Sequence, residues 1–170
     1  VHDLDRAATG FRMLDILRDF INGLSDEGNR KKSPRENADV AAVALFFSVI
    51  GADGEVTAAE RAMLRDLVSA DYADSEVELR ALLEEAEQAD RDSVDLYSFT
   101  SVLNWKLAPE EKVRFIELLW ELAYADGVRH ELEDHVVWRI ADLMGVDGRD
   151  RVFARQRVAE RRGISGEEDT

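Results

Sequence analysis

Two short segments of the sequence place carboxylates at matched positions, where they could bind a divalent cation. Each segment contains the tripeptide Ala-Asp-Gly and, seven residues after its Asp, a Glu. The first pair is Asp53 with Glu60, and the second pair is Asp126 with Glu133. Carboxylate oxygens are among the ligands that Ca²⁺ and Mg²⁺ prefer in proteins. The four acids are therefore candidate metal ligands.

A second interpretation of the same turns needs no ligand. Glycine tolerates the left-handed conformation that ends a helix, and the Asp before it can accept hydrogen bonds from the next helix start. Glu60 can also reach back to Thr57 as its partner in a capping box. Both interpretations stay open: the turns only cap helices, or their acids converge on a cation with weaker support from Glu55 and His130.

Neither turn fits an EF-hand loop. With Gly54 at the sixth loop position, the first and third positions are Val49 and Gly51. The second copy has Leu122 and Tyr124 there. These positions normally supply side-chain oxygens, so a cation site would have to draw on both turns.

Other patterns that could indicate catalysis do not fit. His130 and His135 are five residues apart, which separates them by about 140° around a helix and rules out an H-E-x-x-H zinc pair. His130 with Asp134 fits an ordinary surface contact between helix neighbours. The sequence contains no cysteine, no G-x-S-x-G elbow and no glycine-rich phosphate loop. We therefore expect no enzymatic activity.

Helix start signals recur along the chain. The S/T-x-x-E pattern occurs at Thr57 and Ser75, and Pro109 precedes two acids in a predicted first turn. We expect helices at residues 4–24, 35–51, 58–70, 76–89, 94–106, 109–125, 130–144 and 149–162. The pattern predicts an all-α single-domain bundle of about seven to eight helices.

The two acidic turns belong to a longer internal repeat. Residues 46–60 align without gaps on residues 119–133, and each copy consists of an apolar helix, the turn and an amphipathic helix. Such copies would most simply bury their apolar helices against each other. We therefore predict an internal helix-pair duplication with pseudo-twofold symmetry.

Composition divides the chain into three parts. We expect an N-terminal amphipathic helix and linker at residues 1–30, the helical domain at 31–162 and a flexible acidic tail at 163–170. Within the helical domain, Trp105, Trp120 and Trp138 are expected in the core, with an exposed Trp138 as the alternative.

The net charge of −15 argues against nucleic-acid binding and favours cationic partners. Charge is also unevenly distributed, with −8 over residues 71–95 and +4 over residues 149–162, so self-association is possible. The most apolar stretch, residues 40–50, is too short for a membrane span, and no secretory signal is visible. We expect a cytoplasmic protein without a transmembrane segment.

Parts of the chain resemble the TerB-like family of bacterial tellurite-resistance proteins. These parts are Ala52 to Val56 with Glu60, Leu119 to Gly127 with His130 and Glu133, and Arg139 to Val146. The resemblance implies an all-helical domain without catalytic activity, a part in metal-linked stress responses, and relatives in membrane-associated contexts. In the second turn, the family pattern has an acid and an aliphatic residue where this chain has Val128 and Arg129. That difference weakens the expectation that both turns bind a cation equally well.

Two functions follow as expectations. The first is a non-enzymatic stress-response module that binds Ca²⁺ or Mg²⁺ through its repeat-related turns. The alternative is a metal-free protein–protein interaction or scaffold module that uses its charge-sorted surface. In either case the partner would be an unidentified protein, for which a membrane-associated one is a candidate, and not a nucleic acid.

Overall fold

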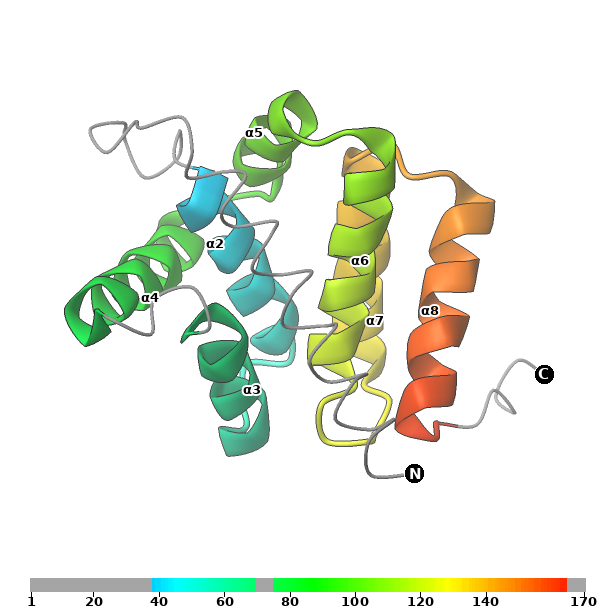
Figure 1. Cartoon of the computed structure of the whole chain (residues 1–170), viewed down its shortest axis with the longest axis horizontal. Coiled ribbons are helices and arrows are strands. Elements are labelled where there is room, and N and C mark those ends of the chain that lie inside the picture. Colours follow the sequence, from blue (N-terminus) through cyan, green and yellow to red (C-terminus); the bar gives the residue numbers. More distant parts are fainter. Residues whose placement is uncertain (1–37, 70–74, 165–170) are drawn as a thin grey trace.

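The computed structural model of the chain describes residues 38–69 and 75–164, and every regular element in these ranges is an α-helix (Figure 1). The helices are α2 (Ala38–Ile50), α3 (Ala58–Ser69), α4 (Glu76–Asp92), α5 (Tyr97–Lys106), α6 (Pro109–Ala123), α7 (Glu131–Leu143) and α8 (Gly148–Arg162). The all-α prediction is confirmed. The helix expected at 4–24, the boundary at residue 30 and residues 165–170 of the expected tail lie outside the described residues.

Most predicted helices lie within a few residues of their expected positions. Thr57 and Glu60 form the predicted capping box, and the Ser75 hydroxyl accepts the backbone N–H of Glu78. The helix expected from residue 94 instead begins at Tyr97, because the Asp95 carboxylate accepts the Tyr97 N–H and holds the preceding residues in a turn.

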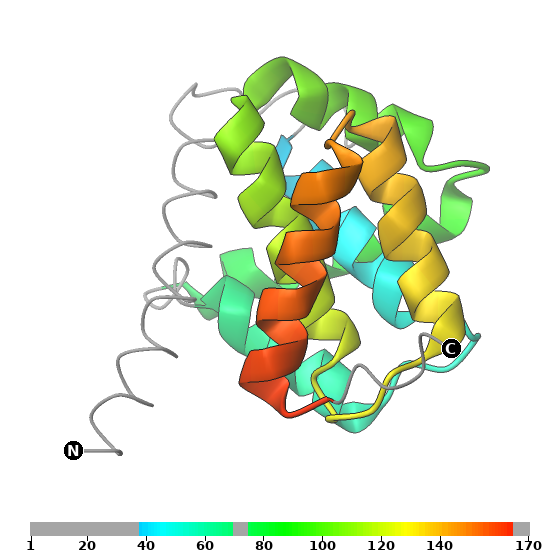
Figure 2. The same ribbon diagram turned by 90° about the vertical axis from the view of Figure 1, so that its right-hand side faces the viewer.

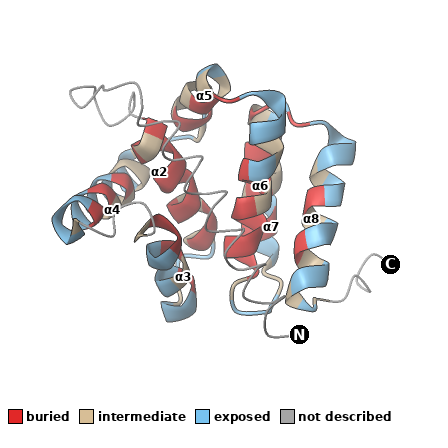
Figure 3. Cartoon of the chain, in the orientation of Figure 1, coloured by how far each residue is buried: buried red, intermediate tan, exposed pale blue. Residues whose placement is uncertain are grey.

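Helix α2 lies at the centre of the bundle. Eleven of its thirteen residues are buried, because its sequence is apolar on nearly every face and neighbouring helices surround it (Figure 3). It contacts α6, the helix that precedes the second turn, where the Phe46 and Phe115 rings lie 5.4 Å apart. The expected contact between these two helices is confirmed, while the duplication itself stays a prediction.

The two Ala-Asp-Gly turns have the same local geometry. Gly54 and Gly127 have φ angles of +87° and +77°, which non-glycine residues rarely adopt. Each preceding Asp accepts the backbone N–H two residues later, Asp53 from Glu55 and Asp126 from Val128, at 3.0 Å in both cases. Figure 2 shows both turns at the same end of the bundle.

Helix α8 is bound to α6 through ion pairs. Glu117 accepts hydrogen bonds from Arg157 and Arg161, and Glu121 pairs with Arg161 and Arg162. Three arginines of the positively charged segment are therefore neutralised within the chain. This leaves less of that charge for the expected self-association.

The prediction that all three tryptophans are in the core is wrong for Trp105, which is 91% exposed. Helix α5 turns Phe99 and Leu103 inward, and a residue two positions after Leu103 faces the opposite side of the helix. Trp120 is fully buried, and the partly buried Trp138 contacts it edge-on at 5.8 Å.

In the part of the chain that the structure describes, none of the helices combines the length and apolar character that crossing a membrane requires.

Candidate metal centre

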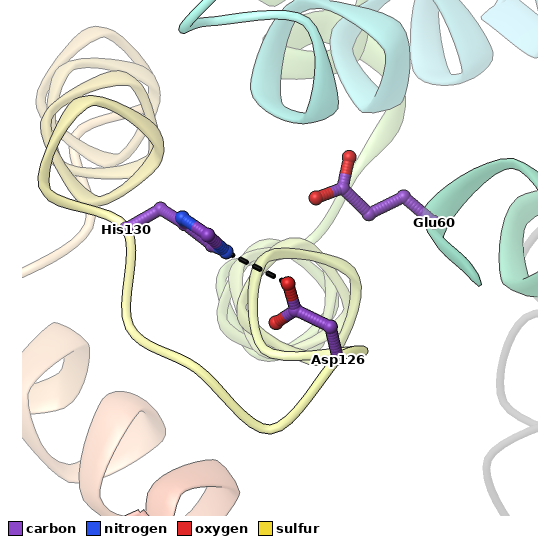
Figure 4. A group of neighbouring side chains, drawn as sticks. All are labelled: Glu60, Asp126 and His130. Atoms are coloured by element: carbon purple, nitrogen blue, oxygen red, sulfur yellow. Dashed lines mark hydrogen bonds and ion pairs between the residues drawn. The ribbon is translucent and has the colours of Figure 1, made fainter. Parts of the chain in front are cut away.

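Three side chains from different elements meet between the two turns. Glu60 comes from the first turn of α3, Asp126 from the turn after α6, and His130 from the residue before α7, and all three point toward one another (Figure 4). One potential ligand atom from each lies within 4.8 Å of the other two. That spacing is close to the roughly 4–5 Å between two ligand atoms on opposite sides of a divalent cation.

Glu133, in the first turn of α7, lies against the same group. Its side chain is fully buried, and in its ionised form neither carboxylate oxygen has a hydrogen-bond donor. Burial, the charge of Glu60 and a proton shared with Glu60 raise the pKa of Glu133 to about 9, and Asp53 and Asp126 add to the rise. All four predicted carboxylates therefore influence one another across the two turns.

In the first turn, Glu60 finds hydrogen-bond partners within the turn itself. The backbone N–H of Glu60 donates to the Thr57 hydroxyl at 3.1 Å, and Glu60 Oε2 accepts the Thr57 N–H at 3.3 Å. This is the capping box that explains the first turn without a ligand. Glu60 is nevertheless 1% exposed and offers an oxygen to the cluster.

The second turn differs from the first at both matching positions. His130 stands where the first copy has Thr57, but its side chain does not cap α7. Instead, its Nε2 atom lies 2.8 Å from Asp126 Oδ2. Glu133 stands where the first copy has Glu60, yet its oxygens have no donor. The capping-only interpretation thus accounts for the first turn but leaves Glu133 unexplained.

Asp126 and His130 form an ion pair. The hydrogen bond to Asp126 raises the pKa of His130, an effect that partial burial opposes. Partial burial would raise the pKa of Asp126, but the hydrogen bonds from His130 and the Val128 N–H outweigh it and lower that pKa. The acids around His130 therefore favour its protonated form.

The remaining predicted residues lie at the edge of the cluster. Asp53 is exposed, and its charge contributes to the raised pKa values of His130 and Glu133. Glu55 is also exposed and contacts Asp53 through its backbone N–H. His130, predicted as a supporting residue, instead lies directly among the possible ligand atoms.

Sequence reasoning missed the role of Arg129 and Asp134. The Arg129 guanidinium donates to Asp134 at 2.5 Å, and Asp134 is 4% exposed. The surface pair expected between His130 and Asp134 is therefore wrong, since His130 bonds Asp126. Burial and the neighbouring Asp134 raise the pKa of Tyr124 to about 12. The sequence signal for this ion pair was the departure from the family pattern at Val128 and Arg129, because it puts a positively charged side chain beside the second turn.

The fold and the cluster together define a class: an all-helical protein in which two helix–turn–helix units bring acids together at one end. The family model described as "Tellurite resistance protein TerB" matches residues 39–156, and the chain belongs to this family. No match was found among curated proteins or among solved structures.

Proposed function

We propose that this protein is a non-enzymatic module that binds a divalent cation between its two acidic turns. Glu60 of α3, Asp126 of the turn after α6 and Glu133 of α7 would supply oxygens, with Asp53 at the exposed side. Glu133 is the observation that carries the proposal. Its ionised form is costly because it is fully buried without a donor, and a bound cation would stabilise that form.

The electrostatics of the cation-free cluster support the same idea. Four acids close together repel one another, and the cluster responds by keeping a proton on Glu133. A cation would displace that proton and connect segments from both halves of the bundle. Binding would therefore stabilise the packing of α3 against α6 and α7.

The chemistry of the cluster bears on the tellurite named by the family. Tellurite is an oxyanion, and a cluster of carboxylates repels an anion. We therefore propose that this site takes a cation and that any connection with tellurite is indirect, through a stress response in which the cation-bound form acts.

The proposal can be tested by isothermal titration of the chelator-treated protein with CaCl₂, MgCl₂, MnCl₂ and ZnSO₄. The parent should bind at least one of these ions with millimolar or tighter affinity, and the double variant Asp53→Asn with Asp126→Asn should bind it more weakly. Glu84→Gln with Glu85→Gln removes the same charge from an exposed part of α4 and should leave binding unchanged. Absence of binding in the parent would overturn the proposal.

A second candidate function is a protein–protein interaction module, which exposed aromatic residues on α5 favour. Tyr97 is 65% exposed and Trp105 is 91% exposed, and tryptophan and tyrosine often provide much of the binding energy at interfaces. Light scattering over a range of salt and protein concentrations would detect self-association. If the parent captures a protein from lysate and Trp105→Ser does not, the partner is a protein other than a second copy of this chain. Equal capture by both would count against a role for the exposed aromatic residues of α5.

A further inference from the structure

The position of His130 suggests which class of cation the cluster takes. A side chain at the residue before a helix commonly accepts a backbone N–H of the first turn, as Thr57 does before α3. His130 occupies the matching position before α7 and makes no such bond. Its imidazole is directed instead to the carboxylate of Asp126.

The imidazole nitrogen belongs to the same compact group as the carboxylate oxygens. Glu60, Asp126 and His130 each contribute one atom to the set within 4.8 Å, and the buried Glu133 lies beside Glu60 with no donor for its ionised form. Glu133 is a second, independent indication of a ligand, because helix capping does not use it. The compact set thus offers two carboxylates and one imidazole, and Glu133 lies beside Glu60 as a third carboxylate.

This donor set matches some cations better than others. Ca²⁺ takes about six to eight oxygen ligands, and Mg²⁺ keeps several waters and avoids nitrogen. Imidazole suits zinc, copper, iron and nickel, whereas Mn²⁺ resembles Mg²⁺ and Ca²⁺ in favouring oxygen. Zn²⁺ is commonly held by four donors, which can combine nitrogen and oxygen. We infer that His130 is a direct ligand and that the site selects Zn²⁺, as an ion that accepts imidazole nitrogen, over Ca²⁺ and Mg²⁺. This inference rests on the proposed cation site and replaces the Ca²⁺ or Mg²⁺ expected from the sequence.

Metal binding would use the contacts already in place. His130 Nε2 gives up its proton to solvent and turns its lone pair to the ion, while Asp126 Oδ2 exchanges the imidazole for the same ion. Asp126 Oδ1 keeps the Val128 N–H, which holds the carboxylate in position. The ion would thus take the place of the proton between two side chains that already meet.

The first test compares ion selectivity in the full chain after removal of metals. Titration with ZnSO₄, MnCl₂, CaCl₂ and MgCl₂ should show Zn²⁺ binding at least about tenfold more tightly than Ca²⁺ and Mg²⁺. His130→Asn should weaken Zn²⁺ binding by more than about tenfold, since even a residue that only supports a ligand can cost 10- to 100-fold. His135→Asn is the matched control, because His135 is exposed on α7, and it should behave as the parent.

The second test observes the ligand directly and needs no variant to fold. Pulsed electron paramagnetic resonance of the parent with bound Mn²⁺ should show coupling to a ¹⁴N nucleus, and His135→Asn should retain it. Bound Mn²⁺ without nitrogen coupling, or equal preference for Ca²⁺ in the parent, would overturn the inference while leaving the proposed cation site in place. Failure of the parent to bind any of the four ions would overturn the proposed function as well.

Discussion

His130 Nε2 lies 2.8 Å from Asp126 Oδ2, where Asp126 belongs to the second Ala-Asp-Gly turn and His130 is the residue before α7. The contact brings an imidazole into a group of acids that also includes residues of the first turn. In the first copy, Thr57 at the matching position caps its own helix. The first copy therefore uses its side chain at this position to cap its own helix. In the second copy, the His130 side chain does not cap α7 and can bind a ligand.

Replacement of Glu133 tests the charge in the cluster. Glu133→Gln replaces a buried acid that the folded state must keep protonated, so at neutral pH the cation-free variant should be at least as stable as the parent. A cation at 100 times its Kd should stabilise the parent by about 2.7 kcal/mol and raise its Tm by roughly 5–10 °C. The variant should show little of this rise in a thermal melt. An equal rise in both proteins would contradict a role for Glu133 in binding.

The stability of the cation-free protein should fall as pH rises. The folded state raises the pKa of Glu133 from 4.5 to about 9, so it binds more protons than the unfolded state between these values. The contribution of Glu133 to the free energy of unfolding is present in full below pH 4.5 and is lost as the pH approaches 9. The raised pKa of His130 acts in the same direction above pH 6.5, whereas the lowered pKa of Asp126 acts only below pH 3.8.

Urea denaturation in chelator at pH 5, 6, 7 and 8 measures this dependence. Because His130 contributes to the same slope, Glu133→Gln separates the two effects: the variant should lose most of the decline. Saturation with the bound cation should also flatten the parent's profile, since the ion competes with the proton. A parent profile that rises over this range would contradict the prediction.

Loss of Arg129 should destabilise the second turn. Arg129→Met leaves the Asp134 carboxylate with one partner fewer at a site where its side chain is 6% exposed. Removal of one partner from a fully buried pair costs about 3–5 kcal/mol, and we expect about 1–3 kcal/mol here because Arg129 is one-third exposed. Urea denaturation checks the value, with Arg139→Met, at an exposed site on α7, as the control. Equal effects of the two substitutions would exclude a specific role for the pair.

Gly127 should be required for its backbone conformation. Its φ is +77°, and a Cβ atom there would meet no other atom within 4 Å, so Gly127→Ala should cost about 1–2 kcal/mol through backbone strain alone. Gly148→Ala is the comparison, because Gly148 lies in the first turn of α8 without a positive φ and also has open space. That substitution should be neutral or stabilising by up to about 1 kcal/mol. Similar losses for both variants in denaturation would argue against the strain.

Much of the fold can be predicted from this sequence because the signals are local. A capping box, a proline in the first turn and a glycine after the last turn act over a few residues, so Thr57, Pro109 and Gly127 indicate where helices begin and end. The apolar character of α2 also predicts a central position. Trp105 shows the limit, because an aromatic residue with apolar neighbours along the chain faces outward once α5 packs.

The sequence by itself determined the helices, the two turns and the four matched acids. Only the tertiary structure decided which of these side chains meet. The approach of Glu60 to Asp126 depends on how α3 packs beside α6, and the choice of Asp126 rather than Asp134 by His130 depends on where Arg129 lies. Burial without a donor, which sets Glu133 apart from the other acids, is a property of the packed helices and cannot be read from spacing.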